Sequence, residues 1–522
     1  MAMRYDRKPV RHMAAGYMIE GAELMPCTTL LIGKDASYDG STIVARNEDS
    51  GSGSFEPKRF VVVKPEDQPR HYVSVLSHLA IELPDNPQRY TALPNALLDK
   101  GIWAEAGVNE KNVSMSATET LTTNERVLGA DPFVEYVPAQ GKPGEEGYVA
   151  EQPGGIGEED MVTIVLPYIS SAREGVKRLG ALLEQYGTYE MNGIAFSDVD
   201  EIWWLETVGG HRWYARRVPD DAYVTMPNEL GVDRFSFEDA YGEQKDFMCC
   251  PDLKEFVEEN HLDLTLGEGE MNPRDAFGSH SDSDHVYNTP RAWAIQRFLN
   301  PRTCRWDGPD ADFTPESDDI PWCRVPERKL TIEDVKYALS LHYQGTPFDP
   351  YSRRGHRSDH GIYRPIGINR NSQLSVVQLR PYRDEAYRAV QWIAFGSNVF
   401  NALVPFYANV TTTPAYLAGT DDRVTTENFY WENRVIAALA DAHYHEAMAD
   451  VERYQEKVGG MGHHMLKETD AAAASAADVH AVLEAANERM AGLLRKETDD
   501  LLDKVLFCAS MGMKNAFSKD DM

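Results

Sequence analysis

Two short apolar runs that follow Cys27 constrain the fold of this chain more than any other feature. Residues 28–32 (TTLLI) and 42–45 (TIVA) are β-branched and apolar, and the turn-forming sequence SYDG occupies 37–40 between them. This pattern predicts a β-hairpin. A hairpin pairs its strands antiparallel and brings the chain back to its starting point. The residues that end the second run, up to Asp49, are therefore expected beside Cys27.

The rest of the chain mixes strands and helices without a regular alternation. Further strands are predicted at 59–63, 113–117, 161–165, 193–196, 202–207, 213–218 and 223–225. Short strands in this spacing favour antiparallel sheets over β-α-β units. Helices are predicted at 170–186, 289–299 and 331–341, and the last begins with a Thr331–Asp334 pair that resembles a capping box. The apolar repeat from Val479 onward predicts a helical C-terminal region. The fold class is predicted to be α+β.

The charge and hydropathy of the chain argue against two kinds of partner. The 522 residues include 52 Lys and Arg against 83 Asp and Glu, for a net charge of −31. Like-charge repulsion then disfavours nucleic acid and anionic membrane surfaces. The sequence has no apolar run of about 18 residues, so no membrane span is predicted. Residues 1–26, here called the leader, are interpreted as neither a secretory signal nor an anchor, because Arg11, Glu20 and Glu23 interrupt each apolar stretch.

The cysteines and histidines give no pattern of a disulfide framework or a metal site. The six cysteines are few and irregularly spaced, and no CxxC pair occurs, which favours a reducing, cytoplasmic location. His443 and His445 are two positions apart, so on a helix they point to different faces. No metal and no cofactor are predicted.

Cys27 is the candidate nucleophile on chemical grounds. The predicted hairpin brings Arg46 and Asp49 next to it. A thiol becomes a good nucleophile when a neighbouring base or cation favours the thiolate. From these residues alone, a buried and inert strand cysteine remains the alternative.

Sequence blocks over nearly the whole chain add a more specific signal. They are 27–29 (CTT), 39–42 (DGST), 46–49 (RNED), 57–60 (PKRF), 107–111 (GVNEK), 115–120 (MSATET), 206–211 (ETVGGH), 218–221 (VPDD), 287–293 (YNTPRAW) and 404–407 (VPFY). In this combined order the chain resembles the dipeptidases of peptidase family C69. These are N-terminal nucleophile hydrolases, similar to choloylglycine hydrolases and penicillin V acylases.

The resemblance implies a fold and a maturation step. The fold is a four-layer αββα sandwich with a core at 27–420 that carries loop insertions, and with a helical region at 421–522 that belongs to the same unit. The leader is a propeptide removed by self-cleavage. The α-amine of Cys27 then acts as general base for its own thiol, because its pKa of about 7.7–8.0 lies near working pH. A start at a later methionine such as Met25 is the alternative, and it still leaves Pro26 to be removed.

The same resemblance assigns roles around the nucleophile. Arg46 stabilises the thiolate or binds a substrate carboxylate, and Asp49 holds the new α-ammonium by a charge-assisted hydrogen bond. Asn47, between them, belongs to the set that binds substrate or the oxyanion.

The oxyanion donors and a late arginine come from more distant blocks. A backbone N–H near Glu119 is one donor, and the side-chain amide of Asn228 is the candidate for the second. Each such donor is worth ~2.7–4 kcal/mol. Arg291 is the candidate for the late active-site arginine, with Arg297 one helical turn further on as its rival.

The expected reaction is hydrolysis of short peptides, chiefly dipeptides, through a thioester on Cys27 and without a cofactor. Two alternatives stay open: an acyl-amide hydrolase of the choloylglycine or penicillin acylase kind, and a non-catalytic interaction protein similar to the secernins. The expected partner is a small peptide substrate. The Ala-rich C-terminal helices offer a packing face, so a homo-oligomer is an open possibility.

Overall fold

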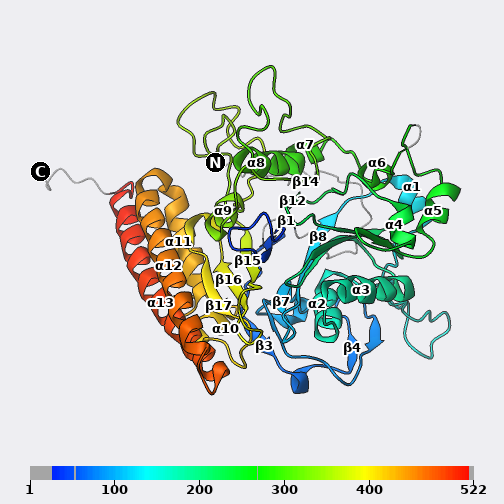
Figure 1. Cartoon of the computed structure of the whole chain (residues 1–522), viewed down its shortest axis with the longest axis horizontal. Helices are drawn as coiled ribbons and strands as arrows, with labels where there is room; N and C mark the ends of the chain where they lie inside the picture. The colour runs from blue at the N-terminus through cyan, green and yellow to red at the C-terminus, as the bar shows by residue number, and fades with distance from the viewer. Residues whose placement is uncertain (1–25, 52–53, 267–268, 516–522) are drawn as a thin grey trace, which may run out of the picture.

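The computed structural model describes residues 26–51, 54–266 and 269–515. Helices and two main antiparallel sheets make up this part of the chain, which confirms the predicted α+β class. Figure 1 shows the two sheets in the middle of the molecule, with the C-terminal helices on one side and a smaller helical layer on the other.

The first sheet holds the predicted hairpin. Within the described residues it has seven strands, in the order β14 (Cys323–Arg324), β12 (Tyr223–Met226), β1 (Cys27–Ile32), β2 (Thr42–Asp49), β15 (Asn371–Leu379), β16 (Ala389–Phe395) and β17 (Val404–Tyr407). β1 and β2 pair antiparallel, with Cys27 opposite Glu48 and Thr29 opposite Arg46. The hairpin prediction is confirmed, and its register brings the end of β2 to the start of β1.

The second sheet lies against the first. It has six strands among the described residues, in the order β13 (Phe247–Cys249), β11 (Arg212–Arg217), β10 (Ile202–Val208), β9 (Met191–Ser197), β8 (Ser114–Leu121) and β7 (Ala106–Val108). β8 and β9 contact β1 and β2 across the space between the sheets. Two smaller ribbons pair β3 (Val61–Val63) with β6 (Tyr90–Ala92), and β4 (His71–Val73) with β5 (Ala80–Glu82).

Helices cover the outer faces of both sheets and the loops between strands. They are α1 (Glu125–Ala130), α2 (Glu158–Val165), α3 (Ala172–Tyr186), α4 (Phe237–Tyr241), α5 (Leu253–Glu259), α6 (Pro273–Phe277), α7 (Asp284–Tyr287), α8 (Thr289–Leu299), α9 (Ile332–Ala338), α10 (Ala415–Ala418), α11 (Phe429–Ala442), α12 (Tyr444–Ala473) and α13 (Val479–Met511). Short 3-10 turns lie at Pro65–Asp67, Leu98–Lys100, Leu166–Tyr168 and Asn398–Phe400. α3 packs on β9, β10 and β11, whereas α12 and α13 pack on β17 (Figure 1).

The alternation of side chains along β1 divides the molecule into two apolar cores. Leu31 and Val44 belong to the core between the sheets and under α3. Leu30 and Ala45 point the other way, into the core shared with α8, α9 and the C-terminal helices. Successive strand residues face opposite sides of a sheet. Cys27 is an even number of positions from Leu31, so its side chain faces the second sheet.

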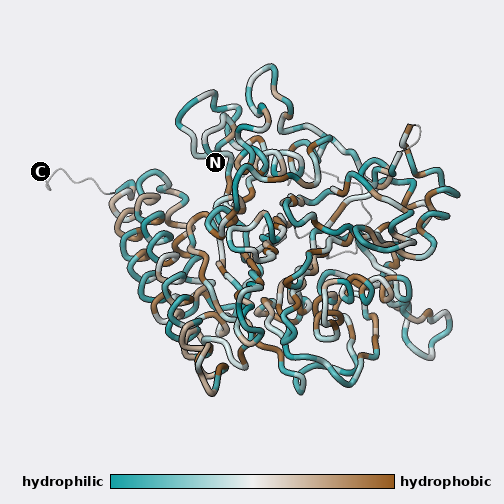
Figure 2. Tube along the Cα trace, in the orientation of Figure 1, coloured by the Kyte–Doolittle hydropathy of each residue, from teal (hydrophilic) through white to brown (hydrophobic). Residues whose placement is uncertain are grey.

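The C-terminal helices share a core with the first sheet. Val451, Leu483 and Met490 are fully buried and belong to the same apolar cluster as Trp392 of β16 and Phe406 of β17. Figure 2 shows the tube alternating between hydrophilic and hydrophobic colours along α11–α13, as in amphipathic helices. Burial of one face of each helix against the sheet explains why the apolar repeat predicted this region correctly.

One sequence prediction about secondary structure is wrong. Residues 161–165 are not a strand; they form the C-terminal half of helix α2. The apolar run is short, and periodicity alone does not separate a buried strand from a buried helix segment. Three acidic residues open the helix, and Asp160 Oδ2 accepts a hydrogen bond of 2.9 Å from the N–H of Gly157. Acidic side chains are favourable at the positive end of a helix. The capping box of Thr331 and Asp334 is confirmed at the start of α9.

Candidate active site

Cys27 is the first residue of β1 and is fully buried between the sheets. Nη2 of Arg46, on the neighbouring strand β2, lies 2.8 Å from its Sγ. The strand register explains this contact: Arg46 faces Thr29, two residues along β1, so the long arginine side chain reaches Cys27 on the same face. The structure therefore places the two residues as the hairpin predicted.

Arg46 is held by two buried carboxylates. Its Nη1 forms an ion pair with Glu105, and its Nη2 lies 2.6 Å from Glu158 Oε1. Nη1 also donates to the carbonyl oxygen of Ala117 at 3.1 Å. Burial opposes the positive charge, but Cys27 and these carboxylates raise the pKa of Arg46 well above its ordinary value. A permanent cation thus lies against the sulfur.

Burial and a neighbouring arginine act in opposite directions on the pKa of the Cys27 thiol. Burial raises its pKa well above the ordinary value for a cysteine. Arg46 acts in the opposite direction, while Glu119, Glu158 and Glu105 add to the rise. A cation therefore lies beside the sulfur, while burial of Cys27 disfavours the thiolate.

Asn228 and Glu119 lie next to Cys27. Oδ1 of Asn228, which follows β12, accepts a hydrogen bond from the backbone N–H of Cys27 at 3.2 Å. Its Nδ2 donates to the Thr120 carbonyl oxygen at 3.0 Å and to Glu119 at 3.4 Å. Glu119 in turn accepts from the hydroxyl of Thr29 at 2.6 Å. Burial raises the pKa of the Glu119 carboxyl to about 8.

Arg291, on helix α8, contacts the backbone of Cys27. Its Nη1 donates to the carbonyl oxygen of Cys27 and to Thr28 Oγ1, the latter at 2.7 Å, and its Nη2 lies 2.7 Å from Asn228 Oδ1. Arg291 is fully buried. Arg297, its rival in the sequence, pairs instead with Asp307 at the partly exposed side of α8. The structure thus brings Arg291, and not Arg297, to Cys27.

Asp49 lies on the opposite face of β2 from Arg46 and is held by a second arginine. It pairs with Arg364, and its Oδ1 accepts from Nδ2 of Asn371 at 2.8 Å. The Arg364 atom that contacts Asp49 is Nη2, and Nη2 also donates to the carbonyl oxygen of Pro26 at 3.3 Å. Arg364 therefore links the expected α-ammonium ligand to the residue before the nucleophile.

The structure does not bring Asn47 to the sulfur. Its Nδ2 donates to the carbonyl oxygens of Leu339 and Ile366, at 2.7 and 3.3 Å, and its Oδ1 accepts from Asn398 at 2.8 Å. Asn47 therefore ties β2 to the chain that follows α9. Alternation explains this position, because the neighbour of an inward-facing Arg46 on a strand must face outward.

Sequence reasoning did not find Glu105, Glu158 or Arg364. Glu158 opens helix α2 within an acidic triplet, and that triplet was a signal for a helix start, not for a contact with Arg46. Glu105 and Arg364 lie in irregular segments, and the sequence carries no local signal for their contacts.

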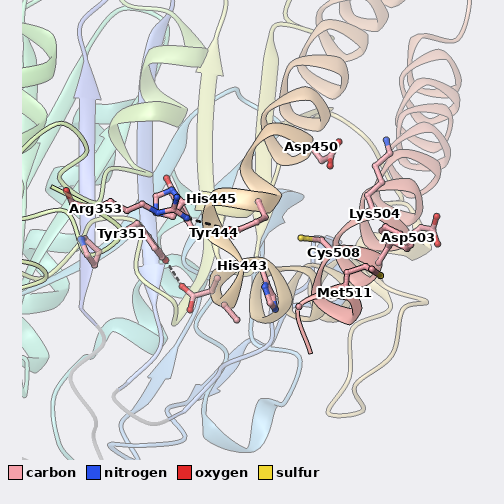
Figure 3. Close-up of a pocket in the computed structure, with 17 residues that line it drawn as sticks. Tyr351, Arg353, His443, Tyr444, His445, Asp450, Asp503, Lys504, Cys508 and Met511 are labelled. Carbon is pink, nitrogen blue, oxygen red and sulfur yellow. Dashed lines mark hydrogen bonds and ion pairs between the residues drawn. The ribbon is translucent and has the colours of Figure 1, made fainter. Parts of the chain in front are cut away.

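A hollow of about 1060 Å³ lies elsewhere, between the junction of α11 with α12 and the end of α13. Figure 3 shows Tyr351, His443, Tyr444, His445 and Cys508 around it. Cys27 is not among its lining residues.

In the parts of the chain that the structure describes, no three His, Cys, Asp or Glu side chains are grouped to hold a metal ion. Nor is any helix of those parts long and apolar enough to cross a membrane.

Comparison with known proteins identifies the family. The model of peptidase family C69 matches residues 26–457, so the chain belongs to this family. A dipeptidase of Bifidobacterium longum is 62% identical over 95% of this chain and 100% of its own length. A probable dipeptidase A of Streptococcus pyogenes serotype M18 is 54% identical, over 95% of this chain and 98% of its own. Dipeptidase A of Lactobacillus helveticus is 43% identical, over 92% and 96%.

Proposed function

We propose that this chain is a dipeptidase that uses Cys27 as an N-terminal nucleophile. The observation that carries the proposal is the contact of 2.8 Å between Arg46 Nη2 and Cys27 Sγ. Asn228 and Arg291 hold the backbone N–H and the carbonyl oxygen of the same residue. Family membership and the names of the similar proteins, dipeptidase in each case, support the choice of substrate. Two facing antiparallel sheets with helices outside them support an αββα sandwich of the N-terminal nucleophile hydrolase type.

Removal of the leader creates the general base. Hydrolysis of the Pro26–Cys27 bond converts the amide nitrogen of Cys27 into an α-amine. Asn228 Oδ1 already accepts a hydrogen bond from this nitrogen in the leader-bearing chain, so the amine is oriented from the start. Its pKa of about 7.7–8.0 allows it to take the thiol proton and return it to the leaving group. Asp49, in the buried pair with Arg364, is the proposed partner of the α-ammonium.

Hydrolysis then proceeds in two steps. The Cys27 sulfur attacks the scissile carbonyl carbon of the dipeptide, while Arg46 stabilises the thiolate. The α-ammonium protonates the leaving amine, and a thioester remains on the sulfur. Water, activated by the same amine, hydrolyses the thioester and releases the N-terminal amino acid.

The N–H near Glu119 and the Asn228 amide are the proposed oxyanion donors. The Nδ2 group of Asn228 has two hydrogens. One is held firmly by the Thr120 carbonyl oxygen at 3.0 Å, whereas the 3.4 Å contact to Glu119 is long for a hydrogen bond. The second hydrogen is the one that turns to the oxyanion as it forms. Arg291 fixes Asn228 Oδ1 and so keeps the amide in place.

A substrate panel with matched variants tests the proposal. The full chain is assayed on unmodified dipeptides, N-acetylated dipeptides, and glycine and taurine conjugates of bile acids. We expect hydrolysis of the unmodified dipeptides and its loss in Cys27→Ala. A preference for the conjugates would assign an acyl-amide hydrolase instead. No turnover of any substrate after the leader is removed would favour a non-catalytic protein with this fold.

A further inference from the structure

Side chains hold each backbone polar group at the junction between the leader and β1. The carbonyl oxygen of Pro26 accepts from Arg364 at 3.3 Å, the N–H of Cys27 donates to Asn228 at 3.2 Å, and the carbonyl oxygen of Cys27 accepts from Arg291. A peptide segment that is removed by an unrelated protease does not need its backbone held by three buried side chains. The bond to be broken is therefore held in one geometry by buried side chains.

Arg364 is the member of this set that touches the bond from the leader side. Its side chain is 4% exposed and lies in the loop between α9 and β15, with its guanidinium carbon 4.9 Å from the ring centroid of Tyr287. An arginine is always charged in a protein. Its Nε is buried and has no hydrogen-bond partner among the described residues. Arg364 thus places positive charge and the Nη2 donor next to the Pro26 carbonyl oxygen.

We propose that Arg364 is a catalytic residue for removal of the leader, in which it stabilises the oxyanion that forms on the Pro26 carbonyl oxygen. The inference rests on the proposed function, because it takes Cys27 as the nucleophile of its own processing. It separates two oxyanion sites in one protein: Arg364 serves the leader bond once, and the Asn228 side serves dipeptides in each turnover.

The step balances with water as the only co-reactant. Sγ of Cys27 bonds to the Pro26 carbonyl carbon, and the carbonyl π electrons move to the oxygen that Arg364 holds. The C–N bond then breaks, and the Cys27 nitrogen keeps that electron pair and takes the proton that the thiol gave up. The product is a thioester of Pro26 on Cys27 beside a new α-amine. Water cleaves the thioester, releases the leader as a carboxylic acid and restores the thiol.

The position of Asp49 gives Arg364 a second part in the same event. The Nη2 atom that donates to Pro26 also binds Asp49. After the Pro26 carbonyl leaves, Asp49, still held by Arg364, is the proposed partner of the new α-ammonium. One arginine thereby couples loss of the leader to completion of the amine site.

The test follows leader removal in the full chain by intact-mass spectrometry. Arg364→Gln removes the donors, and we expect processing to slow about 10²-fold or more, the usual effect of losing an oxyanion donor. Arg364→Lys keeps a positive charge beside Asp49, and its leader should be removed at an intermediate rate. Arg380→Gln is the matched control, because Arg380 is an equally buried arginine paired with an aspartate, Asp470, away from the nucleophile. We expect Arg380→Gln to lose thermal stability but to keep the wild-type processing rate.

Two further arms separate the outcomes. Hydroxylamine cleaves a thioester but not a peptide bond, so it should not speed processing of Arg364→Gln, which is blocked before the thioester. When an added protease removes the leader at Cys27, the Arg364→Gln variant should keep a much larger share of the wild-type rate of dipeptide hydrolysis than it keeps of the wild-type rate of leader removal. Processing of folded Arg364→Gln at the wild-type rate, while Cys27→Ala stays uncut, would overturn the role of Arg364 alone. Normal processing of Cys27→Ala would overturn the proposed function.

Discussion

The guanidinium of Arg46 and the sulfur of Cys27 lie 2.8 Å apart in a water-poor space between two sheets. Glu105 pairs with Nη1 of the guanidinium, and Glu158 pairs with Nη2. The charge next to the sulfur is therefore fixed before any substrate arrives. Fixed charges in a buried site stabilise a forming anion without reorganisation at the moment of reaction.

Arg46→Lys should weaken the nucleophile through its pKa. Arg46 lowers the pKa of Cys27 against the effect of burial. A lysine has one ammonium in place of the two Nη groups that pair with Glu105 and contact Sγ, so its charge is held less closely to the sulfur and the pKa of Cys27 rises. We expect the pH profile of Cys27 alkylation in the leader-free protein to move to higher pH, with kcat/KM lower by about 10²-fold. Arg297→Lys, at a partly exposed pair, is the control and should change neither. An unshifted alkylation profile in Arg46→Lys would contradict the role.

Arg291 and Arg297 make a matched pair on one helix. Arg291→Gln removes donors to the Cys27 carbonyl oxygen and to Asn228, so we expect kcat to fall by about 10²–10³-fold. Arg297→Gln removes one partly exposed ion pair, which is worth only about 0–1 kcal/mol, and kcat should stay near the wild-type value. Equal losses in the two variants would show that α8 matters only for stability.

The sequence predicted that Arg46 lies beside Cys27 because the hairpin alone determines this contact. Once residues 28–32 and 42–45 pair antiparallel, Arg46 must return to Cys27, and the structure has this register. Strand alternation also decides the face, which separates Arg46 from Asn47. The family resemblance supplied Asn228 and Arg291, whose contacts with Cys27 span more than 200 residues of chain and have no local pattern.

The remaining part depends on tertiary contacts that no local pattern encodes. Glu105, Glu158 and Arg364 reach the site from irregular segments or from a helix end. Residues 161–165 were predicted as a strand because a buried helix segment and a buried strand have the same apolar composition. The acidic triplet that precedes them is the local sign of a helix start.

Glu119 should make the stability of the leader-bearing chain depend on pH. Burial raises its folded-state pKa to about 8, so between the unfolded value near 4.3 and about pH 8 the folded state binds the extra proton. Its contribution is present at low pH and is lost as pH rises, by at most about 1.4 kcal/mol per pH unit. We expect thermal unfolding curves between about pH 5 and pH 8 to show a smaller decline in Glu119→Gln than in the wild type. Equal declines would contradict the assignment.

The ion pair behind the site should contribute strongly to stability. Lys58 Nζ lies 2.5 Å from Glu48 Oε1, and both side chains are fully buried. Lys58→Met leaves the carboxylate without its cation and should cost about 3–5 kcal/mol of unfolding free energy. Burial raises the pKa of Glu48 and Lys58 lowers it, so this pKa rises further in Lys58→Met, and the loss should be smaller at low pH, where a proton replaces the lysine. Adding Glu48→Gln to Lys58→Met should restore part of the lost unfolding free energy, which denaturant unfolding measures. Lys504→Met, at an exposed pair, should change stability by less than about 0.5 kcal/mol.

The most direct test of the account follows the N-terminal residue and the activity of one sample over time. Freshly made full chain is sampled for intact mass and for hydrolysis of a dipeptide. We expect activity to rise in proportion to the fraction of molecules that begin at Cys27, and Cys27→Ala to show neither change. Full dipeptide hydrolysis by molecules that still carry the Pro26–Cys27 bond would contradict it, because the nitrogen of Cys27 is then an amide and cannot act as the base.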